Sequence, residues 1–215
     1  MKRILLALGL LLGLSAPALA QVPCISVGGV NSVPQVGVTC AQEPSTTSYS
    51  ATAVGVVPAS ATTDLACITG SPSKVTRIQS VRLSGTAGTA INVPVTLLKR
   101  AVADTGGTAA TGTALPVPYA HDSNNAAAVA TTTAYTGNPT INDASPGILD
   151  SGVLVLTATG TLADSPYTYF DYSERNFVQA IILRSAAQQV CVNLNATSPS
   201  SGVVNVTFRW TEAAQ

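Results

Sequence analysis

Charged residues are scarce in this chain. They make up 9% of its 215 residues, and ten basic and ten acidic side chains leave no formal net charge. A nucleic-acid-binding surface needs a strong excess of Lys and Arg to neutralise phosphates, so the composition argues against nucleic acid as a partner. Disorder is disfavoured as well, because 46% of the residues are hydrophobic and many of them stand in alternating runs.

Histidine occurs once, as His121, and the four cysteines form no CxxC motif. A zinc site with Cys and His ligands at the usual spacing is therefore not expected. His121 precedes Asp122, but neighbours in sequence rarely face each other productively, and the segment 122–125 is typical of a turn. Asp122, Asn124 and Asp143 carry the oxygen ligands that calcium prefers, yet their spacing matches no known calcium loop.

Glycoside hydrolysis needs two carboxylates that face each other across a cleft. Asp164, Asp171 and Glu174 are the candidates in this sequence, and solvated strand ends explain them equally well. We therefore predict no catalytic, metal or cofactor residue, and we expect the protein not to be an enzyme.

The densest aromatic group of the sequence consists of Tyr167, Tyr169, Phe170 and Tyr172. In a strand, Phe170 and Tyr172 share one face, and Tyr167 and Tyr169 share the other. One pair is expected in the core. At most the other pair forms an exposed platform on which a sugar could stack.

Only the first twenty residues contain a long apolar run, and they match a secretion signal. Lys2 and Arg3 precede the apolar residues 4–14, and the small-residue site 18–20 precedes Gln21. The run is too short to span a bilayer as a helix. We expect an exported protein, periplasmic or extracellular, that begins at Gln21 and has no membrane span.

Export favours disulfide bonds between the cysteines Cys24, Cys40, Cys67 and Cys191. Three pairings are possible. Proximity favours Cys24 with Cys40, which would contribute roughly 3 kcal/mol by restricting the unfolded chain. Cys67 and Cys191 would then join strands that are distant in sequence.

The segment 74–100 contains the strongest strand signals, two β-rich runs around a Gly/Thr/Ala turn. We interpret it as the central hairpin of the fold. Val93, Val95 and Leu97 alternate with polar or small residues, as in a strand with one buried face. The first run is less regular, which predicts a β-bulge near residues 79–80.

Further strands are predicted at 49–57, 64–69, 149–158, 167–172, 177–183, 189–194 and 203–211. The last has the clearest alternation, with Val204, Val206, Phe208 and Trp210 on one side. Short strands separated by turn signals predict an all-β fold, an antiparallel two-sheet β-sandwich for which a jelly roll is one candidate topology.

The predicted organisation is a signal peptide over 1–20, a disulfide-tied N-terminal arm over 21–47 and a sandwich domain over 48–215. A nearly strandless loop over 101–147 is expected to cross the domain surface, with 126–134 as a helical turn or an edge strand. Long loops on a rigid scaffold often carry binding sites. The candidate contact residues in this loop are Tyr119, His121, Asp122, Asn124 and Tyr135.

Several segments resemble a family of small proteins encoded by tailed bacteriophages and prophages. They are Thr-Gly-Ser at 69–71, Lys-Val-Thr-Arg-Ile at 74–78, Leu-Leu-Lys-Arg at 97–100, Gly-Gly-Thr at 106–108, His-Asp-Ser-Asn-Asn at 121–125, Ala-Tyr-Thr-Gly-Asn-Pro-Thr at 134–140, the strands of 178–194 and Phe-Arg-Trp-Thr-Glu at 208–212. The resemblance spans roughly residues 62–212 and depends on the order and spacing of these segments.

This resemblance implies a sandwich-like structural or decoration protein of the virion, without enzymatic activity, whose partners are capsid or tail proteins or further copies of itself. The secretion signal and the N-terminal cysteines depart from the family pattern. They leave open an alternative function, an exported surface protein that binds cell-surface components or glycan.

Overall fold

The computed structural model describes residues 46–143, 146–160, 167–172, 179–199 and 201–215, which belong to the compact unit Ser45–Gln215. The predicted signal peptide, N-terminal arm and Cys24–Cys40 pair lie outside these residues. Within the described ranges, no helix is both long enough and apolar enough to cross a membrane.

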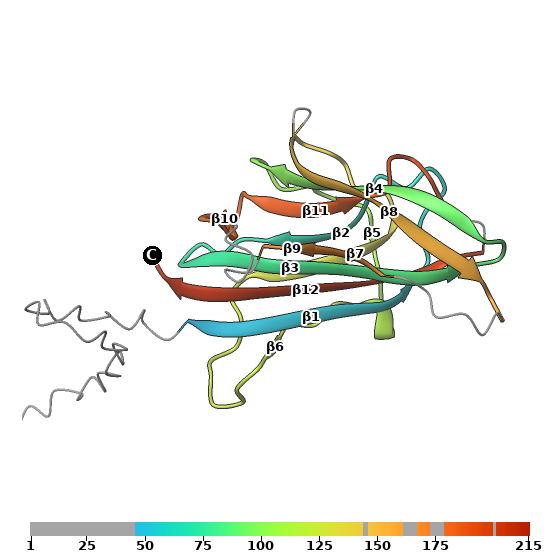
Figure 1. The fold of residues 1–215 in the computed structure, drawn as a ribbon. Helices are drawn as coiled ribbons and strands as arrows, with labels where there is room; N and C mark the ends of the chain where they lie inside the picture. The colour runs from blue at the N-terminus through green and yellow to red at the C-terminus, as the bar shows by residue number, and fades with distance from the viewer. Residues whose placement is uncertain (1–45, 144–145, 161–166, 173–178, 200) are drawn as a thin grey trace, which may run out of the picture. The chain divides into compact units, whose positions relative to one another are not determined.

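The fold is all-β, as predicted (Figure 1). The described residues form twelve strands and one 3-10 helix: β1 (Thr47–Val56), β2 (Asp64–Thr69), β3 (Lys74–Ala87), β4 (Ile91–Arg100), β5 (Thr108–Ala109), η1 (Gly112–Ala114), β6 (Tyr119–Ala120), β7 (Thr131–Gly137), β8 (Gly147–Ala158), β9 (Thr168–Asp171), β10 (Ile181–Leu183), β11 (Gln189–Asn193) and β12 (Val203–Ala214).

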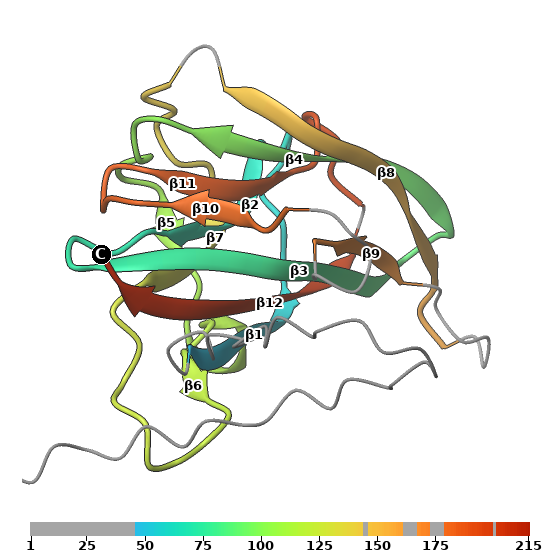
Figure 2. The ribbon, with the colours of Figure 1, turned by 60° about the vertical axis from the view of Figure 1, so that its left-hand side comes forward.

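The strands form one curled, mixed sheet in the order β5-β7-β2-β11-β4-β8-β3-β12-β1-β6. Neighbours are antiparallel, except that β8 and β3 are parallel over two residue pairs. β8 also pairs with β4, so it links the half of the sheet that contains β4 to the half that contains β3 (Figure 2). Off this path, β9 and β10 both pair with β3.

One hydrophobic cluster takes side chains from both halves of the sheet. In β12 the predicted alternation is confirmed, because Val204, Val206, Phe208 and Trp210 are all fully buried. The ring of Trp210 stacks on Tyr49 of β1, with 5.7 Å between centroids. The inward face of β12 is thereby committed to packing, which leaves its outward face for contact with a partner.

The predicted hairpin over 74–100 is wrong in its pairing. β3 pairs with β12 along one edge, and with β10, β9 and β8 in succession along the other. No edge of β3 is left for β4, which enters the other half of the sheet between β11 and β8. The predicted bulge is confirmed. Arg209 pairs with Ser80 and Trp210 with Ile78, which leaves Gln79 as the extra residue.

The segment 101–147, which was predicted to be a nearly strandless loop, contains β5, β6 and β7. β7 pairs with β2 on one side and with β5 on the other. It begins at Thr131, later than the predicted element at 126–134. This strand was not distinguished from a helical turn because the segment is rich in Thr and Ala and has few large apolar side chains, so no alternation of apolar and polar residues could be recognised. The same segment supplies β5 and β6, the two ends of the strand order.

Candidate binding site

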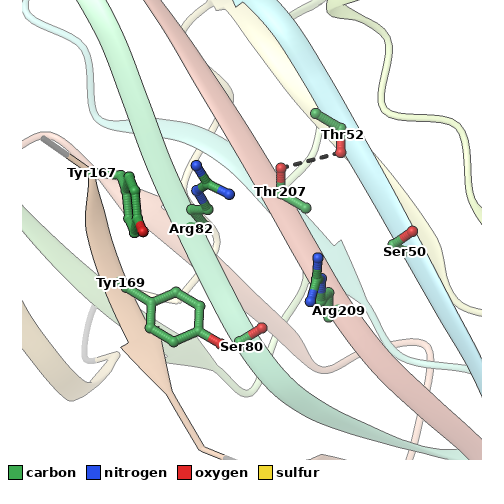
Figure 3. Close-up of a pocket in the computed structure, with 8 residues that line it drawn as sticks. All are labelled: Ser50, Thr52, Ser80, Arg82, Tyr167, Tyr169, Thr207 and Arg209. Atoms are coloured by element: carbon green, nitrogen blue, oxygen red, sulfur yellow. Dashed lines mark hydrogen bonds between the residues drawn. The ribbon is translucent and has the colours of Figure 1, made fainter. Parts of the chain in front are cut away.

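A shallow hollow of about 400 Å³ lies on the outward side of β1, β12, β3 and β9 (Figure 3). We call it the outer-face hollow. Its eight lining residues are two arginines, two tyrosines and four hydroxyl side chains: Ser50, Thr52, Ser80, Arg82, Tyr167, Tyr169, Thr207 and Arg209. This combination offers cations, aromatic rings and hydrogen-bonding hydroxyls on one surface.

Strand register places most of these side chains in two adjacent rows that cross the strands. The first row contains Thr52, Thr207, Arg82 and Tyr169, each opposite the next. The second row contains Ser50, Arg209 and Ser80. Residues directly opposite on antiparallel strands share a face, whereas successive residues alternate. Because Phe208 and Trp210 are buried, the intervening Arg209 must project outward.

Arg82 is held against an aromatic ring. Its guanidinium carbon lies 4.0 Å from the ring centroid of Tyr167. Such a contact contributes about 0.5–1 kcal/mol at an exposed site and orients the plane of the guanidinium group. In Figure 3 this group projects between Tyr167 and Thr207. Thr207 in turn shares a 3.1 Å hydrogen bond between side-chain hydroxyls with Thr52.

The predicted facing of the aromatic group is confirmed. Tyr167 and Tyr169 are 57% and 48% exposed, whereas Phe170 is buried and Tyr172 packs against the core. The two arginines of the hollow were not among the residues predicted from the sequence. Each arginine lies between two buried apolar residues of a strand. Because side chains alternate between the two faces of a strand, this pattern could have predicted that each arginine faces outward.

Four of the predicted contact residues lie together in and just after β6. Tyr119 is 70% exposed, and His121, Asp122 and Asn124 are exposed as well. The carboxylate of Asp122 accepts a 2.9 Å hydrogen bond from the backbone N–H of Asn124, which confirms the predicted turn.

Tyr119 connects this turn to the outer-face hollow. It pairs with Ser50 of β1, so the two side chains share the outward face of the sheet. The row that contains Ser50 and Arg209 is thereby extended by an exposed phenol. Tyr119 of the predicted loop therefore lies on the same face of the sheet as the outer-face hollow.

The fifth predicted contact residue, Tyr135, is buried and does not belong to that surface. It lies on β7 beside the disulfide between Cys67 and Cys191. Burial, followed by the charges of Asp104 and Asp64, raises the pKa of its phenol. Tyr135 is therefore a packing residue of the interior.

A buried ion cluster lies near this disulfide. Arg100 is almost fully buried, and its Nη2 lies 2.6 Å from Oδ2 of Asp64. Asn193 donates a 2.7 Å hydrogen bond to the other carboxylate oxygen of Asp64. Asp104 is more weakly paired, with Oδ1 at 3.5 Å from Nε of Arg100. Burial, and then the hydrogen bond and charge of Asp64, raise the pKa of Asp104 to about 7, while Arg100 opposes the shift.

The same region gathers the ligand-type atoms of Asp64, Cys67, Asp104 and Cys191 within 4.8 Å of one another. The two sulfurs are bonded to each other, however, and Arg100 already pairs with Asp64. The cluster is therefore a structural ion network next to a disulfide and does not present thiolate ligands to a metal.

The other candidate residues are not brought together. Asp143 accepts a hydrogen bond from Ala101 N at the end of β4, whereas Asp122 follows β6 beside β1. Of the three proposed glycosidase carboxylates, Asp164 and Glu174 lie outside the described residues. Asp171 is opposite Ser80, on the same side of β9 as Tyr169.

Comparisons with known proteins give no family for this chain. No protein-family model matches it, and neither a curated protein nor a solved structure matches it.

Proposed function

We propose that this protein is non-catalytic and works by presenting a binding surface, the outer-face hollow together with Tyr119. The observation that carries the proposal is the convergence of two arginines and three exposed tyrosines on one outward face of the sheet. A sheet whose other face is packed in the core holds these groups in fixed relative positions. Rigid presentation of this kind suits recognition.

The chemistry of the lining supports binding over turnover. Hydrolysis by acid and base catalysis would use carboxylate or imidazole groups aimed at one reacting bond. The eight lining residues supply guanidinium, phenol and hydroxyl groups instead. An enzyme would show turnover that is lost on replacement of Asp171 or Glu174, and we expect no such turnover.

Two biological settings follow from the sequence. The resemblance to phage and prophage proteins favours a structural or decoration module of a virion, built as a two-sheet sandwich or jelly roll with an N-terminal arm tied by a Cys24–Cys40 disulfide. The secretion signal favours an exported adhesion or carbohydrate-binding module in the periplasm or outside the cell. The outer-face hollow favours the second setting, because arginine, tyrosine and hydroxyl groups suit a polyhydroxylated ligand.

Attachment of the purified protein to particles and to cells of its host tests the proposal. The double substitution Arg82→Ala and Arg209→Ala should weaken attachment and leave the thermal midpoint nearly unchanged, since both side chains are exposed. Arg184→Ala is the matched control, because it removes one exposed cation that does not line the hollow. Co-sedimentation with particles would support the virion setting, and retention on cells the adhesion setting. Attachment that survives the double substitution in a folded protein contradicts the proposal.

A further inference from the structure

We infer that the outer-face hollow, with Tyr119 at its margin, binds a short acidic oligosaccharide whose sugar rings carry carboxylate or sulfate groups. The inference rests on the proposed function and specifies the ligand of that surface.

Charge is the first reason. Arg82 and Arg209 lie on neighbouring strands in adjacent rows, because Arg82 pairs with Thr207 and Arg209 with Ser80. Such diagonal neighbours have Cα atoms about 7–8 Å apart. Two positive side chains on such neighbouring residues repel each other, and an anion between or above them relieves the repulsion. The carboxylate closest to the two arginines in strand register is Asp171, which is opposite Ser80. It is not one of the residues that line the hollow.

The second reason is the extent of the surface. Tyr119 stands on β6, and Tyr169 on β9, with β1, β12 and β3 between them. At the usual strand spacing, the strands that carry these two residues are about 19 Å apart across the sheet. A single small anion would engage only the arginines. A chain of sugar rings that crosses the strands reaches both aromatic margins and the hydroxyls between them.

The third reason is the kind of group on offer. β12 and β3, which carry Arg209 and Arg82, have strand partners along both edges, so their backbone N–H and C=O groups are committed to strand pairing. β1 pairs with β12 along one edge and with β6 at Tyr49 and Ser50 on the other. An acidic peptide therefore cannot add as a further strand beside either arginine-bearing strand, although strand addition is the usual way in which a peptide binds a sheet. The outward face presents only side chains, and Ser50, Thr52 and Thr207 match the hydroxyls of a saccharide in their ability both to donate and to accept hydrogen bonds.

Isothermal titration of the full-length, oxidised protein tests the inference. The probe is a hexasaccharide of alternating glucuronate and N-acetylglucosamine, and its carboxyl-reduced form is the neutral control. We expect the acidic probe to bind at least about tenfold more tightly than the neutral one. Arg82→Ala and Arg209→Ala should each raise the Kd of the acidic probe by about tenfold or more, as for the loss of a charge-assisted hydrogen bond.

Further variants separate charge from geometry. Arg82→Lys keeps the cation but loses the planar guanidinium, so its Kd should fall between those of the wild type and Arg82→Ala. Tyr169→Ala should weaken binding severalfold through the loss of ring contact, whereas Arg184→Ala should leave the Kd unchanged.

Equal affinity for the neutral hexasaccharide, or tighter binding of an oligoglutamate peptide, would overturn the inference. So would binding of the acidic probe that is unaffected by both arginine substitutions. If no hexasaccharide binds while the protein still attaches to particles or cells through Arg82 and Arg209, the ligand class is wrong and the proposed function stands.

Discussion

The indole N–H of Trp210 donates a 3.1 Å hydrogen bond to the carboxylate of Glu212, two residues further along β12, inside the protein. The same carboxylate accepts hydrogen bonds from the backbone N–H groups of Val129 and Ala130, at 3.0 and 2.9 Å. Glu212 therefore fixes the segment that precedes β7 to β12. It also satisfies the polar edge of the largest core side chain.

Replacement of Glu212 should be strongly destabilising. In Glu212→Ala three buried or half-buried N–H donors lose their acceptor, and each such loss costs about 1–3 kcal/mol. We expect the free energy of unfolding to fall by roughly 3 kcal/mol or more, measured by urea denaturation. Glu212→Gln retains one acceptor oxygen and should cost about half as much. Equal stability of Glu212→Ala and the wild type would show that the segment is held by other contacts.

Replacement of Trp210 by alanine should cost far more stability than replacement of Arg209, because these neighbours lie on opposite faces of β12. Trp210→Ala empties a fully buried site and should cost about 3–5 kcal/mol, whereas Arg209→Ala changes an exposed side chain and should cost within about 0.5 kcal/mol. Asn205, although it too faces outward, is not a neutral position. Its Oδ1 accepts a 2.7 Å hydrogen bond from Gly55 N at the irregularity in β1, so Asn205→Ala should cost about 1 kcal/mol. Similar losses for Trp210→Ala and Arg209→Ala would contradict the assigned facing.

Local patterns in the sequence were sufficient to predict most of the strands outside 101–147, the inward residues of β12 and the bulge at Gln79. The partners of β3 could not be predicted in this way. Alternation shows which face of a strand is buried but carries no information about which strand lies next to it. The short turn after Ala87 suggested a hairpin, yet the chain crosses there to the other half of the sheet.

In the candidate site too, some features follow from local sequence patterns and others depend on which strands pair. The exposure of Tyr167 and Tyr169 follows from alternation within one short strand. Arg82 and Arg209 are 127 positions apart by residue number, and only the pairing of β3 with β12 makes them neighbours. The burial of Arg100 could not be predicted from the sequence either. Charged residues are rarely buried unless a partner is present, and the partner of Arg100, Asp64, comes from a different strand.

Stability should depend on pH through Asp104. Its pKa is about 7 in the folded protein, against an ordinary value of 3.8. Between these values the folded state binds more protons than the unfolded state, so this group's contribution is complete below about pH 4 and is lost as the pH rises through 7. Thermal unfolding at pH 4.5 to 8 should show this decline. Asp104→Asn should reduce the decline, because an amide does not titrate. If the variant and the wild type have parallel profiles, another group is responsible.

Intact-mass measurement of the exported chain tests both the predicted cleavage of the signal peptide and the predicted disulfide bonds. The exported chain is expected to begin at Gln21 and to contain no free thiol, so alkylation should add no mass until the protein has been reduced. Four cysteines that are alkylated without reduction would contradict both predicted disulfides. A mass that includes residues 1–20 would contradict the predicted signal peptide.

The bond between Cys67 and Cys191 should be the main covalent restraint on the described fold. It joins directly paired residues of β2 and β11 that are 124 positions apart in sequence. A bond that closes so long a loop restricts the unfolded chain by about 4–5 kcal/mol in the chain-entropy model, and typical measured values are 2–4 kcal/mol. The double variant Cys67→Ala and Cys191→Ala should therefore lose at least about 2 kcal/mol of unfolding free energy in urea.

Accessibility supplies an independent test of the same bond. Both cysteines are fully buried, with Tyr135 packed against them. A reductant can attack this disulfide only when the surrounding strands open, so its reduction should be slow in buffer and fast in urea. Partial reduction followed by alkylation and peptide mapping measures the rate at each cysteine. Rapid labelling of Cys191 in the folded protein would show that β11 is not buried between β2 and β4. Slow labelling in buffer, together with the loss of stability in the alanine variant, would establish the disulfide as part of the folded core.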